Sequence, residues 1–227
     1  MPVFIHTKQN NKKRTKMKFS IAASAGLALA TPTAAIPLAS RDDGPGSAAS
    51  IIAKISPASV SCAEHEQCRT NVEVAQPFID AFNKYGFWTY GQIAAVLSLT
   101  AYESADFKYK HNISPGRPGQ GTSNMQMIDF NRKYAASFPE LADSLKEIGD
   151  PGNDDNKKNQ ILALVTDDKY NFGSGPWFLK TQCPEDVQEN LKKGTDDAWN
   201  AYMSCVGVVP DEGRTAYWSR AKAAFGL

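Results

Sequence analysis

The sequence is poor in the side chains that metal centres and histidine-based catalytic sites need. Its 227 residues include three histidines, His6, His65 and His111, and four cysteines. It contains no phosphate-binding loop, no HExxH zinc motif and no serine–histidine–aspartate signature. We therefore expect no metal site and no histidine-based catalysis, and the sequence indicates no cofactor.

Positive charge is also scarce once the N-terminus is set aside. Residues 1–35 hold six of the 25 basic residues and none of the 24 acidic ones, so the remaining residues carry a net charge of −5. Because nucleic-acid binding requires a basic face, this balance excludes that class of protein. The charged fraction of 22% and the aromatic fraction of 10% are typical of a globular chain rather than a disordered one.

The sequence lacks an apolar run of membrane-spanning length, and a short apolar run lies close to the N-terminus. A basic stretch at residues 12–18 precedes an apolar run at 19–30 and small residues at 33–35. This order is typical of a secretory signal peptide, and the run is short for a membrane span, although an uncleaved anchor is the alternative. We expect a signal peptide at 1–35, a flexible pro-segment or lead-in at 36–60 and a folded domain at 61–227. The mature protein is then expected to be secreted, soluble, monomeric and free of membrane partners.

Four cysteines in a secreted chain indicate disulfide bonds, for which three pairings exist. Cys62 and Cys68 are close in sequence, and Cys183 and Cys205 flank an expected helix. We therefore favour the pairs Cys62–Cys68 and Cys183–Cys205. A zinc site at Cys62, His65 and Cys68 is the disfavoured alternative, because it would have only three nearby ligands and would lie in an oxidising compartment.

Helical periodicity dominates the chain after residue 61. It predicts helices at 72–85, 91–102, 127–138, 139–148, 155–166, 184–191, 196–206 and 211–225. Residues 91–102 are apolar on nearly every side, which predicts a buried central helix. Residues 107–124 are rich in glycine and proline, which favours a loop or a small β-hairpin. The expected class is mainly α with one small loop or hairpin insert.

Glu103 is the first carboxylate of the apolar helix and shares a side with Leu99 and Thr100. Burial and the negative end of the helix dipole both raise a carboxyl pKa. A carboxylic acid kept neutral in this way can donate a proton to a leaving group, as glycosidic bond cleavage requires. The alternative is a glutamate that marks where the last helical turn reaches solvent.

Three short motifs occur in order along the chain. They are Glu103-Ser104, the stretch from Gly121 to Met127 that contains Met125-Gln126, and Tyr170-Asn171-Phe-Gly-Ser-Gly, whose asparagine lies 45 residues after Gln126. Together they resemble the lysozyme-like superfamily, in particular goose-type lysozymes and soluble lytic transglycosylases, over about residues 97–175. The chain departs from that family at Ser123-Asn124 and Lys169, where the family has Gly-Leu and Ala.

The resemblance implies a lysozyme-like helical domain that acts as a glycoside hydrolase on the β-1,4 bonds of an N-acetylhexosamine polymer. Glu103 resembles the general acid, and Asp129, ahead of Asp106, is the candidate second carboxylate. The residues that look like substrate-binding positions are Ser104, Asn124, Gln126, Tyr170, Asn171 and, in an expected turn after the third motif, Trp177. The implied partner is a polysaccharide, either peptidoglycan or, given the acidic body, chitin or chitosan.

Several alternatives stay open. The outcome of the reaction can be inverting, retaining or a lytic transglycosylation, in which the sugar's own hydroxyl attacks. A chitosanase or chitinase activity is a further possibility. Because a fold does not fix a function, the chain can also be a non-catalytic glycan-binding or effector protein on this scaffold. A secreted helical disulfide protein of unrelated role is the last alternative.

Overall fold

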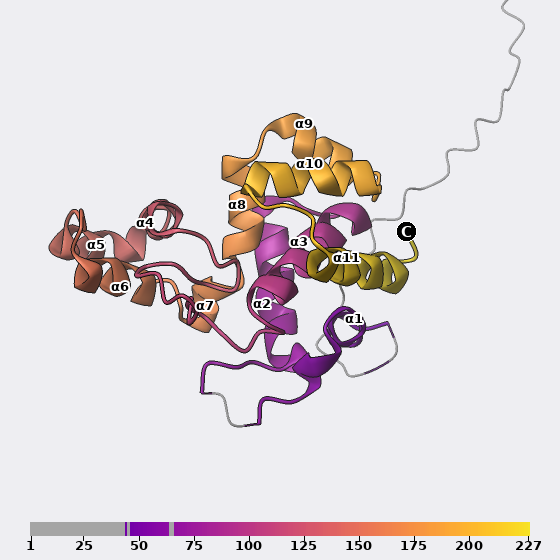
Figure 1. Cartoon of the computed structure of the whole chain (residues 1–227), viewed down its shortest axis with the longest axis horizontal. Helices are drawn as coiled ribbons and strands as arrows, with labels where there is room; N and C mark the ends of the chain where they lie inside the picture. The colour runs from indigo at the N-terminus through magenta and orange to yellow at the C-terminus, as the bar shows by residue number, and fades with distance from the viewer. Residues whose placement is uncertain (1–43, 45, 64–65) are drawn as a thin grey trace, which may run out of the picture. The chain divides into compact units, whose positions relative to one another are not determined.

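The computed structural model describes residues 44, 46–63 and 66–227 (Figure 1). All of them belong to the second of the two units into which the chain divides, residues 35–227. The expected signal peptide at 1–35 and most of the lead-in before residue 46 lie outside the described residues.

The described residues are mainly helical, as expected. The helices after residue 61 are α2 (Asn71–Tyr85), α3 (Tyr90–Glu103), α4 (Ile128–Ala136), η2 (Pro139–Leu141), α5 (Ala142–Ile148), α6 (Asp155–Ala163), α7 (Asp168–Asn171), α8 (Ser174–Gln182), α9 (Glu185–Leu191), α10 (Asp196–Val206) and α11 (Glu212–Phe225). Within the described ranges, β structure is limited to two isolated bridges, which join Gly121 to His111 and to Gln126.

The folded part begins earlier than the expected boundary at residue 61, so the prediction of a flexible lead-in through residue 60 is wrong for residues 46–60. Helix α1 (Ala48–Ile55) starts at Ser47, whose side chain accepts a hydrogen bond from the Ser50 N–H, and the 3-10 helix η1 (Pro57–Val60) follows. Ile52 and Ile55 of α1 are each 1% exposed. They lie on one helical face, which packs against α2 and α11.

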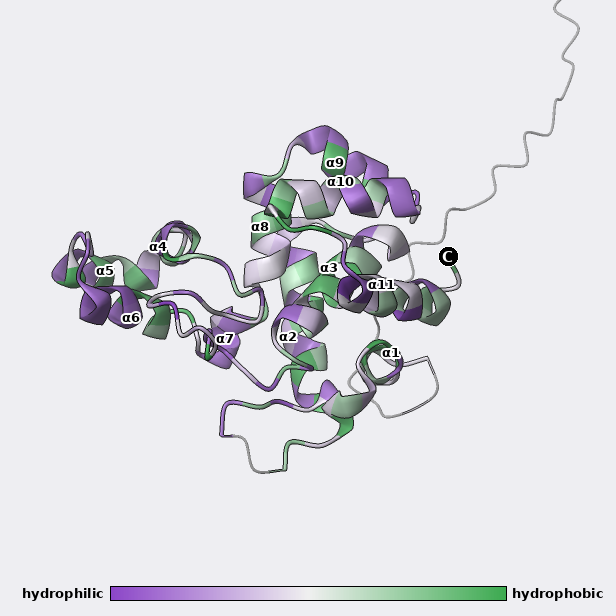
Figure 2. Cartoon of the chain, in the orientation of Figure 1, coloured by the Kyte–Doolittle hydropathy of each residue, from purple (hydrophilic) through white to green (hydrophobic). Residues whose placement is uncertain are grey.

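Helix α3 is the buried central helix that its apolar sequence predicts. All residues from Gly91 to Ala101 are buried, and the helix packs against α1, α8, α9 and α11. Figure 2 shows its apolar residues among the helices that surround it. Gly91 permits the approach of α9, because a Cβ at this position would lie 2.0 Å from the Leu191 carbonyl oxygen.

The structure corrects the expectation of a turn after the third motif. The stretch Gly175-Pro176-Trp177-Phe178, expected as a turn, belongs to α8, where both aromatic side chains are 4% exposed. Pro176 is tolerated there because it falls in the first turn, where its missing N–H is not needed.

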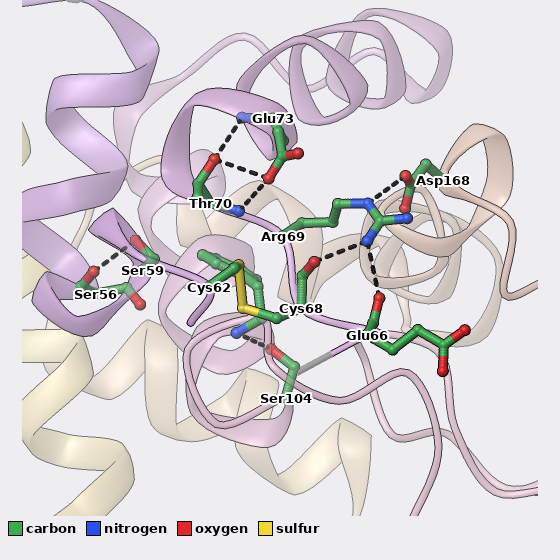
Figure 3. The surroundings of a disulfide bond; sticks show 11 residues. Ser56, Ser59, Cys62, Glu66, Cys68, Arg69, Thr70, Glu73, Ser104 and Asp168 are labelled. Carbon is green, nitrogen blue, oxygen red and sulfur yellow. Dashed lines mark hydrogen bonds and ion pairs between the residues drawn. A yellow bond between two sulfur atoms is a disulfide. The ribbon is translucent and has the colours of Figure 1, made fainter. Parts of the chain in front are cut away.

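Both favoured disulfide pairs are present in the structure. Cys62–Cys68 closes the loop before α2 (Figure 3), and Cys183–Cys205 joins the end of α8 to α10. Cys62 and Cys68, two of the three residues weighed as zinc ligands, are therefore joined to each other in a disulfide. Among the described residues, no helix is both long and apolar enough to cross a bilayer.

Candidate functional site: a polar groove beside the glycine-rich loop

Glu103 lies at the end of α3 and forms an ion pair with Arg214 of α11. The Oε1 atom of Glu103 accepts from Arg214 Nη2 at 2.6 Å and from Nε at 3.1 Å. The two side chains are 17% and 16% exposed. Arg214 also donates to Asp211 and lies over the Tyr102 ring, 4.7 Å from its centroid.

Burial raises the pKa of Glu103, as expected from the sequence, and this effect outweighs the lowering influence of Arg214. The neighbouring residue Ser104 is fully buried and has only main-chain partners: it donates to the Thr100 carbonyl and accepts from the Phe107 N–H. Glu103 and Ser104 thus join the end of α3 to α11 and to the following turn.

The amide side chains of the second motif are buried and bond to one another. Asn124 donates to Gln126 at 3.3 Å, and Gln126 donates to Asn131 at 2.9 Å. Asn131 in turn donates to the carbonyls of Gly119 and Gln126. This network fixes residues 107–124, hereafter the glycine-rich loop, to the start of α4.

The second and third motifs also meet in the structure. The Ser123 N–H donates to Asn171 Oδ1 at 3.0 Å, and the Ser123 hydroxyl donates to the Asn171 carbonyl at 2.9 Å. The Asn124 oxygen and the Asn171 amide nitrogen have no hydrogen-bond partner among the described residues, although both are buried.

Four other residues expected at the site take no part in the hydrogen bonds among Ser123, Asn124, Gln126 and Asn171. The Tyr170 hydroxyl donates to Glu140, at 3.1 Å, rather than to Glu103. Trp177 packs its ring against Tyr134 in the core. Asp129 is exposed in the first turn of α4, where a negative charge suits the helix dipole. Asp106 accepts hydrogen bonds from Ser56 and Tyr217, which ties the turn after α3 to the flanking helices.

Part of the glycine-rich loop also lines a groove of about 980 Å³. Three separate segments form its walls, and no motif in the sequence marks them. The lining residues are Glu66 and Gln67 before α2, Lys110 to Ile113 and Gly116 to Pro118 with Gln120 in the loop, and Asn159, Leu162, Ala163, Thr166 and Asp167 in and after α6.

Hydrogen bonds and ion pairs hold the first wall of the groove to the second. Gln67 Oε1 accepts from the Lys110 N–H and contacts His111 Nδ1, each at 3.0 Å. The Asp168 carboxylate forms ion pairs with Lys110 Nζ and with Arg69 Nε, each at 2.6 Å. Figure 3 shows the pair with Arg69. Burial raises the pKa of Asp168, but the bonds to Lys110 and Arg69 outweigh it and hold that pKa below its ordinary value.

The third wall is joined to the loop through Asn159, whose side-chain oxygen accepts from the Gly119 N–H at 2.9 Å. Gly119 has a φ of +74°, and a Cβ there would lie 2.8 Å from Ile128. Glycine is therefore required where the loop passes between α4 and α6. The groove is a preformed feature of the fold, and its size is that of sites for small organic ligands.

Comparison with known proteins finds a similar fungal protein, named bifunctional dioxygenase (DOX)-epoxy alcohol synthase (EAS), from Fusarium oxysporum (strain Fo5176). It is 51% identical over 156 residues, which cover 67% of this chain but only 12% of the relative. No family model and no solved structure matches.

This relative contradicts the prediction of a glycoside hydrolase, because its name describes dioxygenase and epoxy alcohol synthase activities. The expectation of a cell-wall-degrading glycosidase is wrong. It depended on motifs of only a few residues, which also have plain structural uses: Glu103 pairs with Arg214, and Gln126 fastens a loop. The lysozyme-like resemblance, the polysaccharide partner and the monomeric state stay predictions.

Oxygen chemistry usually depends on a metal, a haem or a flavin. Residues 44, 46–63 and 66–227 contain no group of three or more histidine, cysteine, aspartate or glutamate side chains that could hold a metal ion. The four cysteines are joined in disulfides, and His111 is the one histidine in these ranges. The described residues therefore do not fit a protein-bound metal centre, and no redox step is assigned to them.

Proposed function

We propose that this chain is a binding domain that serves an oxygenation system, and that it holds an oxygenated organic compound in the groove beside the glycine-rich loop. The compound is an epoxy alcohol or a precursor of one. The groove itself carries the proposal, because it combines hydrogen-bonding side chains with apolar surface. The relative's printed activities supply the chemical class of the ligand.

The side chains of the groove suit such a compound. Asn112, Gln120 and Asn159 offer amide groups next to the apolar side chains of Ile113 and Leu162. An epoxide or hydroxyl oxygen needs hydrogen-bond donors, whereas a hydrocarbon segment needs apolar contact. The poor fit to a metal centre supports a role in binding rather than in oxygen activation.

We also propose that the scaffold is lysozyme-like and that the protein is secreted. The contact between Ser123 and Asn171, which brings two of the three motifs together, supports the first proposal. The two disulfides support the second, because such bonds persist in oxidising compartments.

A calorimetric titration with a long-chain epoxy alcohol tests the proposed function. The variant Ala163→Trp places a large ring in the groove from an exposed position on α6, and Ala136→Trp adds the same ring at an exposed position on α4. We expect the parent protein and Ala136→Trp to bind, and Ala163→Trp to bind at least roughly tenfold more weakly. No binding by the parent protein, or equal binding by both variants, would contradict the proposal.

A further inference from the structure

We infer that the groove recognises a hydroxyl group and an epoxide of its ligand through two different side chains. His111 Nε2 accepts a hydrogen bond from the hydroxyl, and Asn159 Nδ2 donates one to the epoxide oxygen. This inference rests on the proposed function, and it names the residues that distinguish an epoxy alcohol from a plain alcohol or a plain epoxide.

The role of each nitrogen in the His111 ring is fixed by its surroundings. Gln67 Oε1 accepts from the Lys110 N–H at 3.0 Å, which identifies it as the amide oxygen, because a backbone N–H can only donate. An amide oxygen can only accept, so His111 Nδ1, at 3.0 Å from it, carries a hydrogen. In the neutral ring, Nε2 is then an acceptor. Nε2 has no hydrogen-bond partner among the described residues, and His111 lines the groove.

The role of the Asn159 amide is fixed in the same way. Its Oδ1 accepts from the Gly119 N–H at 2.9 Å, so the other amide atom is the NH₂ group, which can only donate. This NH₂ group has no hydrogen-bond partner in the described part of the chain, and Asn159 is an exposed residue of the groove. An epoxide oxygen can only accept, so it matches this donor.

His111 and Asn159 lie on neighbouring walls of the groove. A Cβ on Gly121 would lie 2.9 Å from the His111 Cα and 2.9 Å from Leu162 Cδ1, so α6 passes close to the His111 backbone. Asn159 precedes Leu162 by three residues on α6, and side chains at this spacing are neighbours on a helix. One small molecule can therefore reach both side chains.

The loop between these walls is held in place before any ligand arrives. Asn112 Oδ1 accepts from the Gly116 N–H at 2.8 Å, and the Asn112 amide donates to Gln120 Oε1 at 2.9 Å. The Gln120 amide in turn donates to the Met125 carbonyl at 2.9 Å. Fixing the loop in advance lowers the entropy cost of binding.

The charges of the groove favour recognition of uncharged polar groups. The charged residues that line it are two of each sign, namely Lys110, Arg117, Glu66 and Asp167. The Lys110 ammonium is also paired with Asp168 at 2.6 Å. Such a mixed lining favours neither an anion nor a cation strongly. A hydroxyl and an epoxide need only the acceptor on His111 and the donor on Asn159.

The test titrates three matched compounds into the full-length protein by calorimetry. They are the epoxy alcohol, the same molecule with hydrogen in place of the hydroxyl, and the same alcohol with a double bond in place of the epoxide. We expect the epoxy alcohol to bind roughly fivefold or more tightly than either of the others, because each loses one hydrogen bond and leaves a protein group unsatisfied.

Two variants assign the two preferences to their residues. His111→Phe removes the acceptor and keeps a flat ring, so it should abolish the preference for the hydroxyl and keep that for the epoxide. Asn159→Asp keeps an oxygen for the Gly119 N–H and removes the donor, so it should do the reverse. Asn156→Asp adds the same charge to α6 at an exposed position outside the groove, and this control should keep both preferences.

The outcomes separate this inference from the proposed function. If the three compounds bind equally to the parent protein, the inference is overturned while the proposed function stands. If His111→Phe keeps the preference for the hydroxyl, or Asn159→Asp that for the epoxide, another residue such as Glu66 or Gln67 binds that group and the inference is overturned as well. If the epoxy alcohol does not bind, the proposed function fails and the inference fails with it.

Discussion

Arg214 places two N–H groups on a single oxygen of Glu103, although the two residues lie 111 positions apart in the sequence. The pair joins the end of the central helix α3 to the first turn of α11. Because both side chains are largely buried, neither can recover full hydration if its partner is removed.

We predict that Arg214→Gln destabilises the fold by about 2–3 kcal/mol near neutral pH, since it leaves the Glu103 carboxylate buried without its cation. When folding raises the pKa of a carboxyl group, the protein loses stability as the pH rises from the group's ordinary pKa through its folded-state pKa. Removal of Arg214 raises that pKa further. Urea unfolding should therefore show a larger loss at about pH 7 than at about pH 4.

The control for this variant is Arg132→Gln, because Arg132 forms a longer ion pair of 3.6 Å with the exposed Asp150. Such a pair contributes about 0–1 kcal/mol, so the control should change stability little at either pH. An equal loss in Arg214→Gln and Arg132→Gln would contradict the role given to the Glu103–Arg214 pair.

The ion pairs of Asp168 with Arg69 and Lys110 should make the free energy of unfolding fall at low pH. The pKa of Asp168 is lowered in the folded state, so its contribution is present above the ordinary aspartate pKa and is lost as the pH falls through the folded-state value. Asp168→Asn should cost about 1 kcal/mol near neutral pH, after a discount for its 39% exposure. Thermal unfolding of Asp168→Asn and the parent protein over a range of pH measures this difference in stability. The control is Asp155→Asn, which removes an exposed ion pair with Lys158 and should show no comparable effect.

The disulfide between Cys183 and Cys205 should stabilise the fold more than the one between Cys62 and Cys68. The first closes a loop with a sequence separation of 22 and the second one of 6. In the chain-entropy model, loss of the longer loop costs about 3 kcal/mol and loss of the shorter about 2 kcal/mol. Denaturant unfolding of two variants, each with one cysteine pair replaced by alanine, measures which disulfide contributes more stability. A greater loss on removal of Cys62–Cys68 would contradict the prediction.

Helix α1 should be an integral part of the core rather than a lead-in. Ile52→Ala removes a side chain that is 1% exposed and should cost about 2–5 kcal/mol through the lost contacts and the cavity. Lys54→Ala, at an exposed position of the same helix, should have almost no effect. Equal stability of the two variants would show that α1 is not packed as described.

The sequence predicts the local parts of this fold well. The apolar positions that define α2 follow helical spacing, and α3 is recognised because nearly every one of its residues is apolar. The two disulfides join cysteines that are close in sequence or flank one helix. Helix α1 escaped prediction because alanine and serine dominate its region and resemble a linker. Helix α8 escaped it because Gly175-Pro176 is typical of a turn.

The candidate site is harder to predict because its parts come from distant segments. Gln67 meets Lys110 and His111 across more than forty residues, and Gly119 meets Asn159 across a similar distance. Such pairings depend on tertiary packing, which the spacing of residues along the sequence does not predict. Arg214 could not be matched to Glu103 from the sequence for the same reason.

The central claim is that the groove binds an oxygenated amphipathic compound. Amide chemical shifts of the labelled protein, recorded while a long-chain epoxy alcohol is added, test it most directly. The account predicts saturable shifts at residues 110–120 and 159–167, with α10 (Asp196–Val206) unaffected as an internal reference. Shifts confined to α10 or to other surfaces, or no saturable shift at all, would contradict it.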